Sequence, residues 1–225
     1  TNLEHLTSDT DLNSLHKDKR WKKVINLVKK NKEKEEANFD KPLVAKLNKI
    51  YEDDQSHRMR INEINEKYGW ESPQMDSIWT VIGEKDSLNL IEVKKILDTR
   101  GWLGADVVGG KGNSTLFLVI QHADQKTQEQ YLPMMREAVA KGNAAASSLA
   151  LLEDRVALGQ GKKQIYGSQI GMFKETNENY VLPLEDPDNV DKRRAEMGLG
   201  PLADYLKEFG INWDVEAYKK MEDAE

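Results

Sequence analysis

Apolar residues recur every three or four positions along most of the chain, a spacing typical of helices that bury one face. The longest such seam predicts a helix over residues 42–69, with Pro in its first turn and Gly at its end. Two further helices are expected. One begins at Ser72-Pro73, and the other covers residues 88–100, where we predict that Asp86 forms the N-terminal cap.

Two helices are predicted to lie at the centre of the protein, because residues 116–120 and most of 147–158 are apolar on every side. The helix expected between them, over residues 125–141, contains Pro133, which implies a kink or a break. The glycine-rich segment 104–113 is expected to be a flexible loop. A phosphate site there is the alternative, although the GxxxxGK[ST] order is absent.

Alternating residues in 164–173 and 180–184 predict a β-hairpin, followed by short helices near 188–197 and 201–209. The predicted fold is therefore mainly α, a compact multi-helix bundle with one late β-hairpin. Three parts are expected: a basic, partly helical N-terminal appendage (1–41), a helical main domain (42–210) with the hairpin near 164–184, and an acidic C-terminal tail (211–225).

Composition excludes several classes of protein. The 225 residues contain no cysteine, which excludes disulfides, thiolate metal sites and a cysteine nucleophile. The net charge of −6 argues against general affinity for nucleic acid. The longest apolar run, 116–120, is too short for a transmembrane segment, so we expect a soluble protein. The compartment stays open, either cytoplasmic or exported after signal removal.

Positive charge is concentrated in residues 17–36, which hold nine Lys or Arg and four acidic residues. Trp21, Val24, Ile25 and Val28 recur there at helical spacing and predict a short amphipathic helix. We expect Trp21 to pack this helix on the main domain. The alternative is that the basic helix contacts a protein partner or an acidic surface.

Some polar residues occupy positions where the periodicity predicts the core, and burial of a polar group is unfavourable unless it is paired. Asp54 lies on the seam of the 42–69 helix, and Arg58 follows at a favourable spacing of four. Asp154 and Arg155 lie in an apolar helix, side by side, so that at least one needs a partner from elsewhere.

His122 follows the apolar run of a central helix, with Asp124 two positions later. A histidine and carboxylates that meet at the end of such a helix suit general acid–base chemistry. The alternative is a core histidine whose nitrogens are paired. No HExxH-type spacing occurs, and we predict neither a metal nor a cofactor.

The predicted strand 164–169 places Gln164, Tyr166 and Ser168 on one face, and Gly167 between them would let a ligand approach the backbone. The alternative is an edge hairpin in which Gly167 marks a bulge. No GxSxG segment is present, so a serine triad hydrolase is not supported.

Several short blocks resemble, in order, those of a bacterial family of unknown function. The match extends over residues 43–206, with Leu103 and Ser168 as departures where the family favours Pro and Thr. The resemblance implies a bacterial source and a pocket-like set of polar residues, but no established reaction. The blocks are Asp54-Gln55-x-x-Arg58, Gly101-Trp102, Gln121-His122-Ala123-Asp124, Leu152-Glu153-Asp154-Arg155, Gln164-x-Tyr166-Gly167-Ser168-Gln169 and Arg193-Arg194.

The sequence therefore predicts an enzyme with hydrolase-like acid–base chemistry, which acts on a small anionic or peptide-like substrate. His122, Asp54 and Asp154 are the predicted catalytic residues. The alternative is a non-catalytic binding or interaction domain with a structural polar network. The predicted substrate-binding residues are Arg58, Arg155, Gln55, Asp124, Gln164, Tyr166, Gln169 and Arg194.

Overall fold

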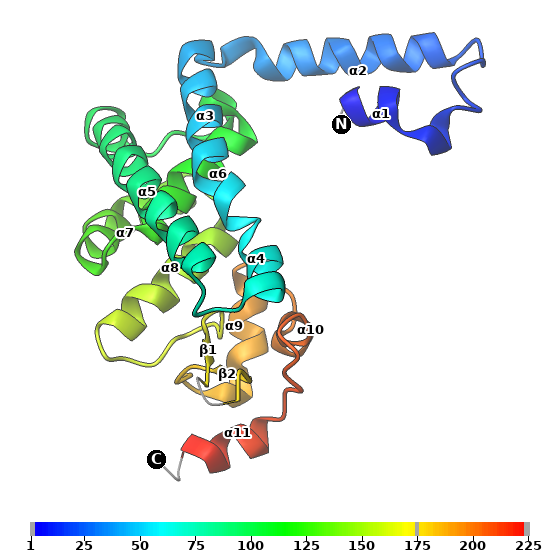
Figure 1. Cartoon of the computed structure of the whole chain (residues 1–225). Helices are drawn as coiled ribbons and strands as arrows, with labels where there is room; N and C mark the ends of the chain where they lie inside the picture. Colours follow the sequence, from blue (N-terminus) through cyan, green and yellow to red (C-terminus); the bar gives the residue numbers. More distant parts are fainter. Residues whose placement is uncertain (1–2, 174–175, 223–225) are drawn as a thin grey trace.

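A computed structural model describes residues 3–173 and 176–222, and it confirms a mainly helical fold with one two-stranded hairpin late in the chain (Figure 1). The helices of the described residues are α1 (Leu3–Ser8), α2 (Trp21–Glu35), α3 (Lys41–Arg58), α4 (Ile61–Tyr68), α5 (Pro73–Arg100), α6 (Ala105–His122), α7 (Gln125–Ala140), α8 (Ala146–Gly159), α9 (Val190–Glu196), α10 (Leu202–Lys207) and α11 (Val215–Glu222). Short 3-10 turns lie at η1 (Thr10–Leu12), η2 (Glu36–Asn38) and η3 (Pro187–Asn189).

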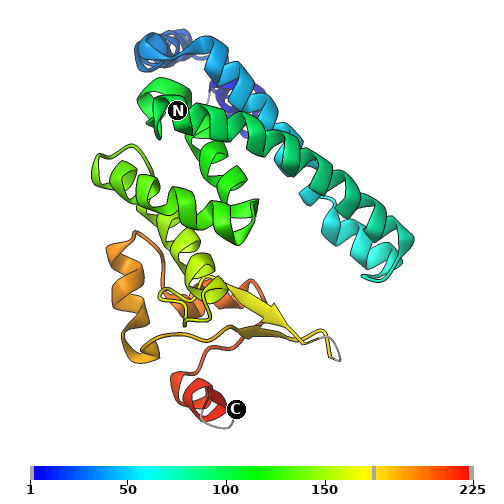
Figure 2. The ribbon, with the colours of Figure 1, turned by 90° about the vertical axis from the view of Figure 1, so that its left-hand side faces the viewer.

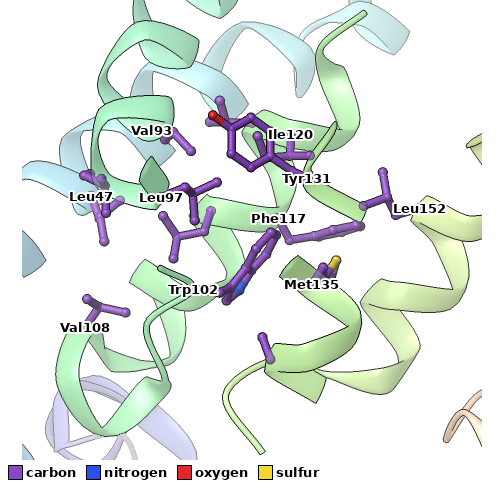
Figure 3. Packing of buried hydrophobic residues seen from close by; sticks show 14 of the residues in the cluster. Leu47, Val93, Leu97, Trp102, Val108, Phe117, Ile120, Tyr131, Met135 and Leu152 are labelled. Carbon is purple, nitrogen blue, oxygen red and sulfur yellow. The ribbon is translucent and has the colours of Figure 1, made fainter. Parts of the chain in front are cut away.

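The main hydrophobic core lies between α3, α5, α6, α7 and α8 (Figure 3). Leu47 of α3, Val93 of α5 and Ile120 of α6 are fully buried in it, together with Tyr131 and Met135 of α7. These residues recur at helical spacing, so each helix turns one apolar stripe to the core. The segment 116–120, predicted to be central, is indeed part of the core.

Two predicted helix boundaries are wrong. The seam over 42–69 is divided between α3 and α4, with a break at Met59 and Arg60. The two helices expected over 73–100 form the single helix α5. Asp86 therefore caps nothing; it lies inside α5, and its carboxylate binds Arg58. Gly83 does not interrupt α5, since glycine within a helix costs only about 1 kcal/mol.

The glycine-rich segment 104–113 is not the expected loop, because α6 begins at Ala105. The helix is kinked at Gly109, whose φ of 73° and ψ of 163° lie outside the helical region. A side chain there would be strained, and its Cβ would approach the ring of Phe39 to 3.3 Å. Pro133 lies within α7 without ending it.

A smaller second core holds the C-terminal part together. The strands β1 (Ile170–Met172) and β2 (Asn179–Val181) pair antiparallel and are shorter than predicted, because 164–169 is mostly irregular. Residues 211–222, predicted as part of a tail, include α11, in which Tyr218 is buried and its hydroxyl accepts a hydrogen bond from the Leu184 amide at 2.6 Å. Residues 223–225 of that tail lie outside the described residues. The buried members of this core are Val181, Leu184, Val190, Leu202, Leu206 and Tyr218.

The N-terminal helices form an arm. Figure 1 shows α2 projecting from the main body at the start of α3, with α1 beside it. Trp21 lies at the far end of α2, and its ring contacts His16 at 4.8 Å between centroids. The expectation that Trp21 packs this helix on the main domain is therefore wrong. None of the helices in the described residues combines the length and the apolar character that a membrane span requires.

Candidate active site

His122 and Asp54 meet where α6 ends beside α3. One carboxylate oxygen of Asp54 lies 3.0 Å from Nδ1 of His122, across 68 residues of chain. An ionised carboxylate only accepts hydrogen bonds, so Nδ1 is the donor of this contact. In the neutral form of the imidazole, the lone pair is then on Nε2. Among the described residues, no side chain or backbone group bonds to Nε2.

Asp54 is 1% exposed, and its environment favours the ionised form. Burial alone raises the pKa of Asp54, but the hydrogen bond and charge of His122, the amide of Gln55 and the charge of Arg58 outweigh it, so that the pKa lies below its usual value. Nε2 of Gln55 donates to the second carboxylate oxygen at 2.6 Å. The Asp54 carboxylate is therefore a fixed, charged support for His122.

Arg58 is held by acids on two helices. Its guanidinium makes a two-pronged bond to Asp86 of α5, with distances of 2.9 and 2.7 Å. It also lies 3.4 Å from a carboxylate oxygen of Asp54 and donates to the Asp54 carbonyl at 2.8 Å. A guanidinium bound in this way has little capacity left for a substrate. Its role here is to join α3 to α5 beneath His122.

An open pocket of about 510 Å³ lies in front of His122. Its wall combines polar side chains with an apolar side formed by Ile61, Trp79 and Ile82. Among the described residues that line it, none carries a hydroxyl or thiol group. The pocket therefore supplies a histidine base but no side chain of the usual nucleophilic kinds. The remaining lining residues are Arg58, Gly83, Asp86, Gln121, Ala123, Gln128 and Arg155.

Arg155 is the cation of this pocket that has no anionic partner. It is exposed on α8, and the described residues offer it neither a hydrogen bond nor an ion pair. Desolvation by nearby atoms lowers the pKa of Arg155 from its ordinary value, with the charge of Tyr205 acting in the opposite direction. Arginine nevertheless stays protonated at neutral pH. Arg155 is thus free to bind an anionic group.

The same corner contains a possible set of metal ligands. One ligand atom each from Asp54, Asp86 and His122 lie within 4.8 Å of one another. Arg58 already bonds both carboxylates, so a cation would have to displace it. The Arg58 guanidinium supplies positive charge to Asp54 and Asp86. That the reaction uses no metal stays our prediction.

Asp154 lies elsewhere: it directly precedes Arg155 on α8, but it points into a different hydrogen-bond network. Its fully buried carboxylate accepts three backbone hydrogen bonds, from Ile165 at 2.6 Å, Tyr166 at 2.9 Å and Ser168 at 2.9 Å. It does not line the pocket of His122. This carboxylate fixes the irregular segment 165–168 to α8, a structural role rather than the catalytic one that the sequence suggested.

Four other predicted substrate-binding residues belong to this second network. Gln164 is fully buried, donates to the carbonyls of Gln169 and Leu182, and accepts from the Gln169 amide. The Tyr166 hydroxyl donates to Glu153, and burial and that acid raise the pKa of Tyr166 to about 12. None of the four lines the pocket of His122. The Gln169 side-chain amide donates to Ser168, and Arg194 donates to the carbonyls of Gly200 and Tyr166. The four residues are Gln164, Tyr166, Gln169 and Arg194.

Asp124 is also outside the pocket lining, where it caps α7 by accepting from the Thr127 amide at 2.8 Å. The acid that contacts the imidazole of His122 is therefore Asp54, and not Asp124, which is only two residues away in the sequence. Three polar lining residues were not among the predicted site residues: Asp86, Gln121 and Gln128. Gln121 directly follows the apolar run 116–120, and that position in a buried helix was a signal for it.

A family model described as a family of unknown function (DUF6624) matches residues 41–216. The matched range contains α3 to α10 and all of the pocket residues, and it leaves out the α1–α2 arm. No curated protein matches the chain, and no solved structure matches it either.

Proposed function

The chain belongs to the DUF6624 family, whose function is unknown, and we propose that this member hydrolyses a small anionic substrate with His122 as general base. The observation that carries the proposal is the Asp54–His122 contact at the wall of an open pocket. The buried carboxylate orients the imidazole, and the free Nε2 is the atom that accepts a proton.

Water is the proposed nucleophile. The lining residues supply a base but neither a hydroxyl nor a thiol, so a covalent intermediate of the serine or cysteine type has no side chain to carry it. His122 would take a proton from water as the water oxygen attacks the substrate, and would return it to the leaving group. Asp54 would stabilise the imidazolium formed between these two steps.

Arg155 is the proposed binding group for the substrate's anion. It reaches the same pocket from α8 and is unpaired in the described structure, whereas Arg58 is occupied by Asp86. Substrate binding and base chemistry thus fall on different helices, α8 for the anion and α6 for the proton. This division makes the two roles separable by mutation.

The proposal is tested with two chromogenic esters that differ in charge, neutral 4-nitrophenyl acetate and anionic mono-4-nitrophenyl succinate. His122→Asn should lower kcat for both by about a hundredfold or more, the usual contribution of a general base. Arg155→Met should raise KM for the succinate and leave the acetate unchanged.

His57→Asn is the matched control, because His57 lies one turn from Asp54 on α3 but lines a different hollow. It should leave both esters unaffected. If His122→Asn folds normally and keeps the wild-type rate on every ester tested, His122 is not the base and the proposal is wrong.

A second candidate function, binding of an acidic partner, is favoured by the arm. α2 exposes Val24 and Leu27, and the described residues offer no ion pair to Lys29 or Lys30. If the arm binds an acidic surface, the double substitution Lys29→Glu, Lys30→Glu should abolish co-sedimentation with anionic lipid vesicles or salt-sensitive binding to polyglutamate. If the wild type and the charge-reversed variant bind equally well, this candidate function is wrong.

A further inference from the structure

Gln121 lies beside His122 in the pocket and has an unpaired amide. The residue is 8% exposed, and among the described residues no hydrogen bond reaches its side chain. The amide of Gln121 is not among the fully buried polar groups without a partner, so it keeps contact with the solvent of the pocket. An amide that is held at the pocket wall without a protein partner is suited to a ligand that supplies one.

Gln128 adds an acceptor of fixed direction to the same pocket. Its Nε2 donates to the carbonyls of Gln121 and Ala123, both at 2.9 Å, so the two hydrogens of this amide are used. These bonds decide which end of the amide is nitrogen and leave Oε1 as an acceptor. No described donor bonds to Oε1, and the residue is only 7% exposed.

Together the two amides fit a ligand that both donates and accepts hydrogen bonds. A carboxylate or a fully ionised phosphate only accepts, so it cannot pair with Oε1 of Gln128. A secondary amide does both: its N–H can donate to Gln128, and its carbonyl can accept from the Gln121 side chain. The pocket also supplies an unpaired cation, Arg155, and an apolar wall that includes Trp79, which is 47% exposed.

We propose that the ligand of this pocket is an N-acylated amino acid or the carboxyl-terminal end of a short peptide. Its amide pairs with Gln121 and Gln128, its carboxylate pairs with Arg155, and its apolar side chain lies against Trp79. The inference rests on the proposed function, because it names the substrate class of the same site and adds Gln121 and Gln128 to its binding residues.

The corresponding reaction is hydrolysis of the amide bond. The oxygen of one water molecule forms a bond to the acyl carbon, and the bond from that carbon to nitrogen breaks. His122 takes one proton from the water and passes it to the leaving nitrogen. The products are a carboxylic acid, which ionises in solution, and a free amine. No oxidant, reductant or further reactant is needed.

The test measures binding by isothermal titration calorimetry, with the full chain and three probes. N-acetyl-L-leucine has the amide and the carboxylate. Its ester analogue, 2-acetoxy-4-methylpentanoate, lacks the N–H, and N-acetyl-L-leucinamide lacks the carboxylate. The first probe should bind about tenfold more tightly than either of the others, since each analogue leaves one polar group of the pocket unpaired.

Gln121→Met preserves the length of the side chain and removes its amide, so it should weaken binding of N-acetyl-L-leucine about tenfold. Gln130→Met is the matched control, because Gln130 is exposed on α7 and does not line the pocket. The inference is overturned if the ester analogue binds as tightly as the amide, if Gln121→Met binds like wild type, or if wild type binds none of the probes.

Hydrolysis and binding can fail separately. If N-acetyl-L-leucine binds as expected but the wild type hydrolyses neither it nor the chromogenic esters, the ligand class stands and the proposed hydrolysis is wrong. If the wild type hydrolyses mono-4-nitrophenyl succinate through His122 but ignores N-acetyl-L-leucine, the reaction stands and the ligand class is wrong. The His122→Asn variant, which should bind without turnover, supplies the affinity free of any reaction heat.

Discussion

Replacement of Asp154 by Asn separates a structural role from a catalytic one. The carboxylate accepts the amide hydrogens of Ile165, Tyr166 and Ser168. An asparagine has one oxygen, so its NH₂ group must face at least one of these three donors. A hydrogen bond to a charged group contributes about 1.5–3 kcal/mol, and a buried donor left unpaired costs about 1–3 kcal/mol. We expect the free energy of unfolding to fall by about 2–4 kcal/mol.

Urea denaturation followed by circular dichroism measures this loss. With a slope of about 2–3 kcal/mol per molar urea, the midpoint should fall by about 1 M. Asp204→Asn is the matched control, since this exposed acid on α10 bonds only Lys207. The reasoning fails if the Asp154→Asn midpoint stays within about 0.2 M of wild type. A fully stable but inactive Asp154→Asn variant would instead restore the catalytic role.

Three further predictions concern pH and metal. The lowered pKa of Asp54 stabilises the fold above the unfolded carboxyl value of about 3.9, and this contribution is lost as pH falls through the lower folded value. The difference in urea midpoint between wild type and Asp54→Asn should therefore shrink as pH falls from about 4 to about 3. A difference that does not shrink over this range would contradict the prediction. Tyr131 donates to Asp98 at 2.7 Å, and burial and that acid raise its pKa to about 12. The contribution of Tyr131 to stability is complete below the tyrosine pKa of the unfolded chain, about 10, and it is lost as pH rises toward 12. Between pH 8 and 11.5 the melting temperature should therefore fall less steeply for Tyr131→Phe than for wild type. Because Arg58 occupies the acidic corner, neither EDTA nor added Zn²⁺ should change the melting temperature; a rise with Zn²⁺ that His122→Asn abolishes would show a metal site.

The hydrophobic pattern predicted the helices well and their ends less well. Periodicity reports which face is buried, and Leu47, Val93 and Ile120 are buried accordingly. It says little about whether two helical stretches are continuous. Asp86 looked like a cap because acids favour that position, but its partner is Arg58, 28 residues away. Local sequence carries no information about such a pairing.

The candidate site was predictable in part. Asp54 and His122 stood out because both are polar at positions where the pattern requires burial, and the structure joins them. The same argument applied to Gln121, which follows an apolar run on α6, but a neutral amide attracts less attention than a charge. Trp79 gave no signal at all, since an aromatic residue in a helix is ordinarily part of the core and here it is exposed.

Burial of a polar residue does not by itself distinguish chemistry from architecture, as Asp154 and His122 illustrate. Both satisfy the pattern, but Asp154 has three backbone donors on its carboxylate. His122 lines a pocket and has one bonded nitrogen and one without a partner among the described residues. The distinguishing quantity is the hydrogen-bonding capacity left over after the fold is complete. The side-chain amide of Gln164 has partners for its donors and its acceptor, whereas the side chains of Arg155 and Gln121 have none among the described residues. Sequence reveals which polar groups are buried, but the unused capacity depends on partners that only the three-dimensional arrangement brings together.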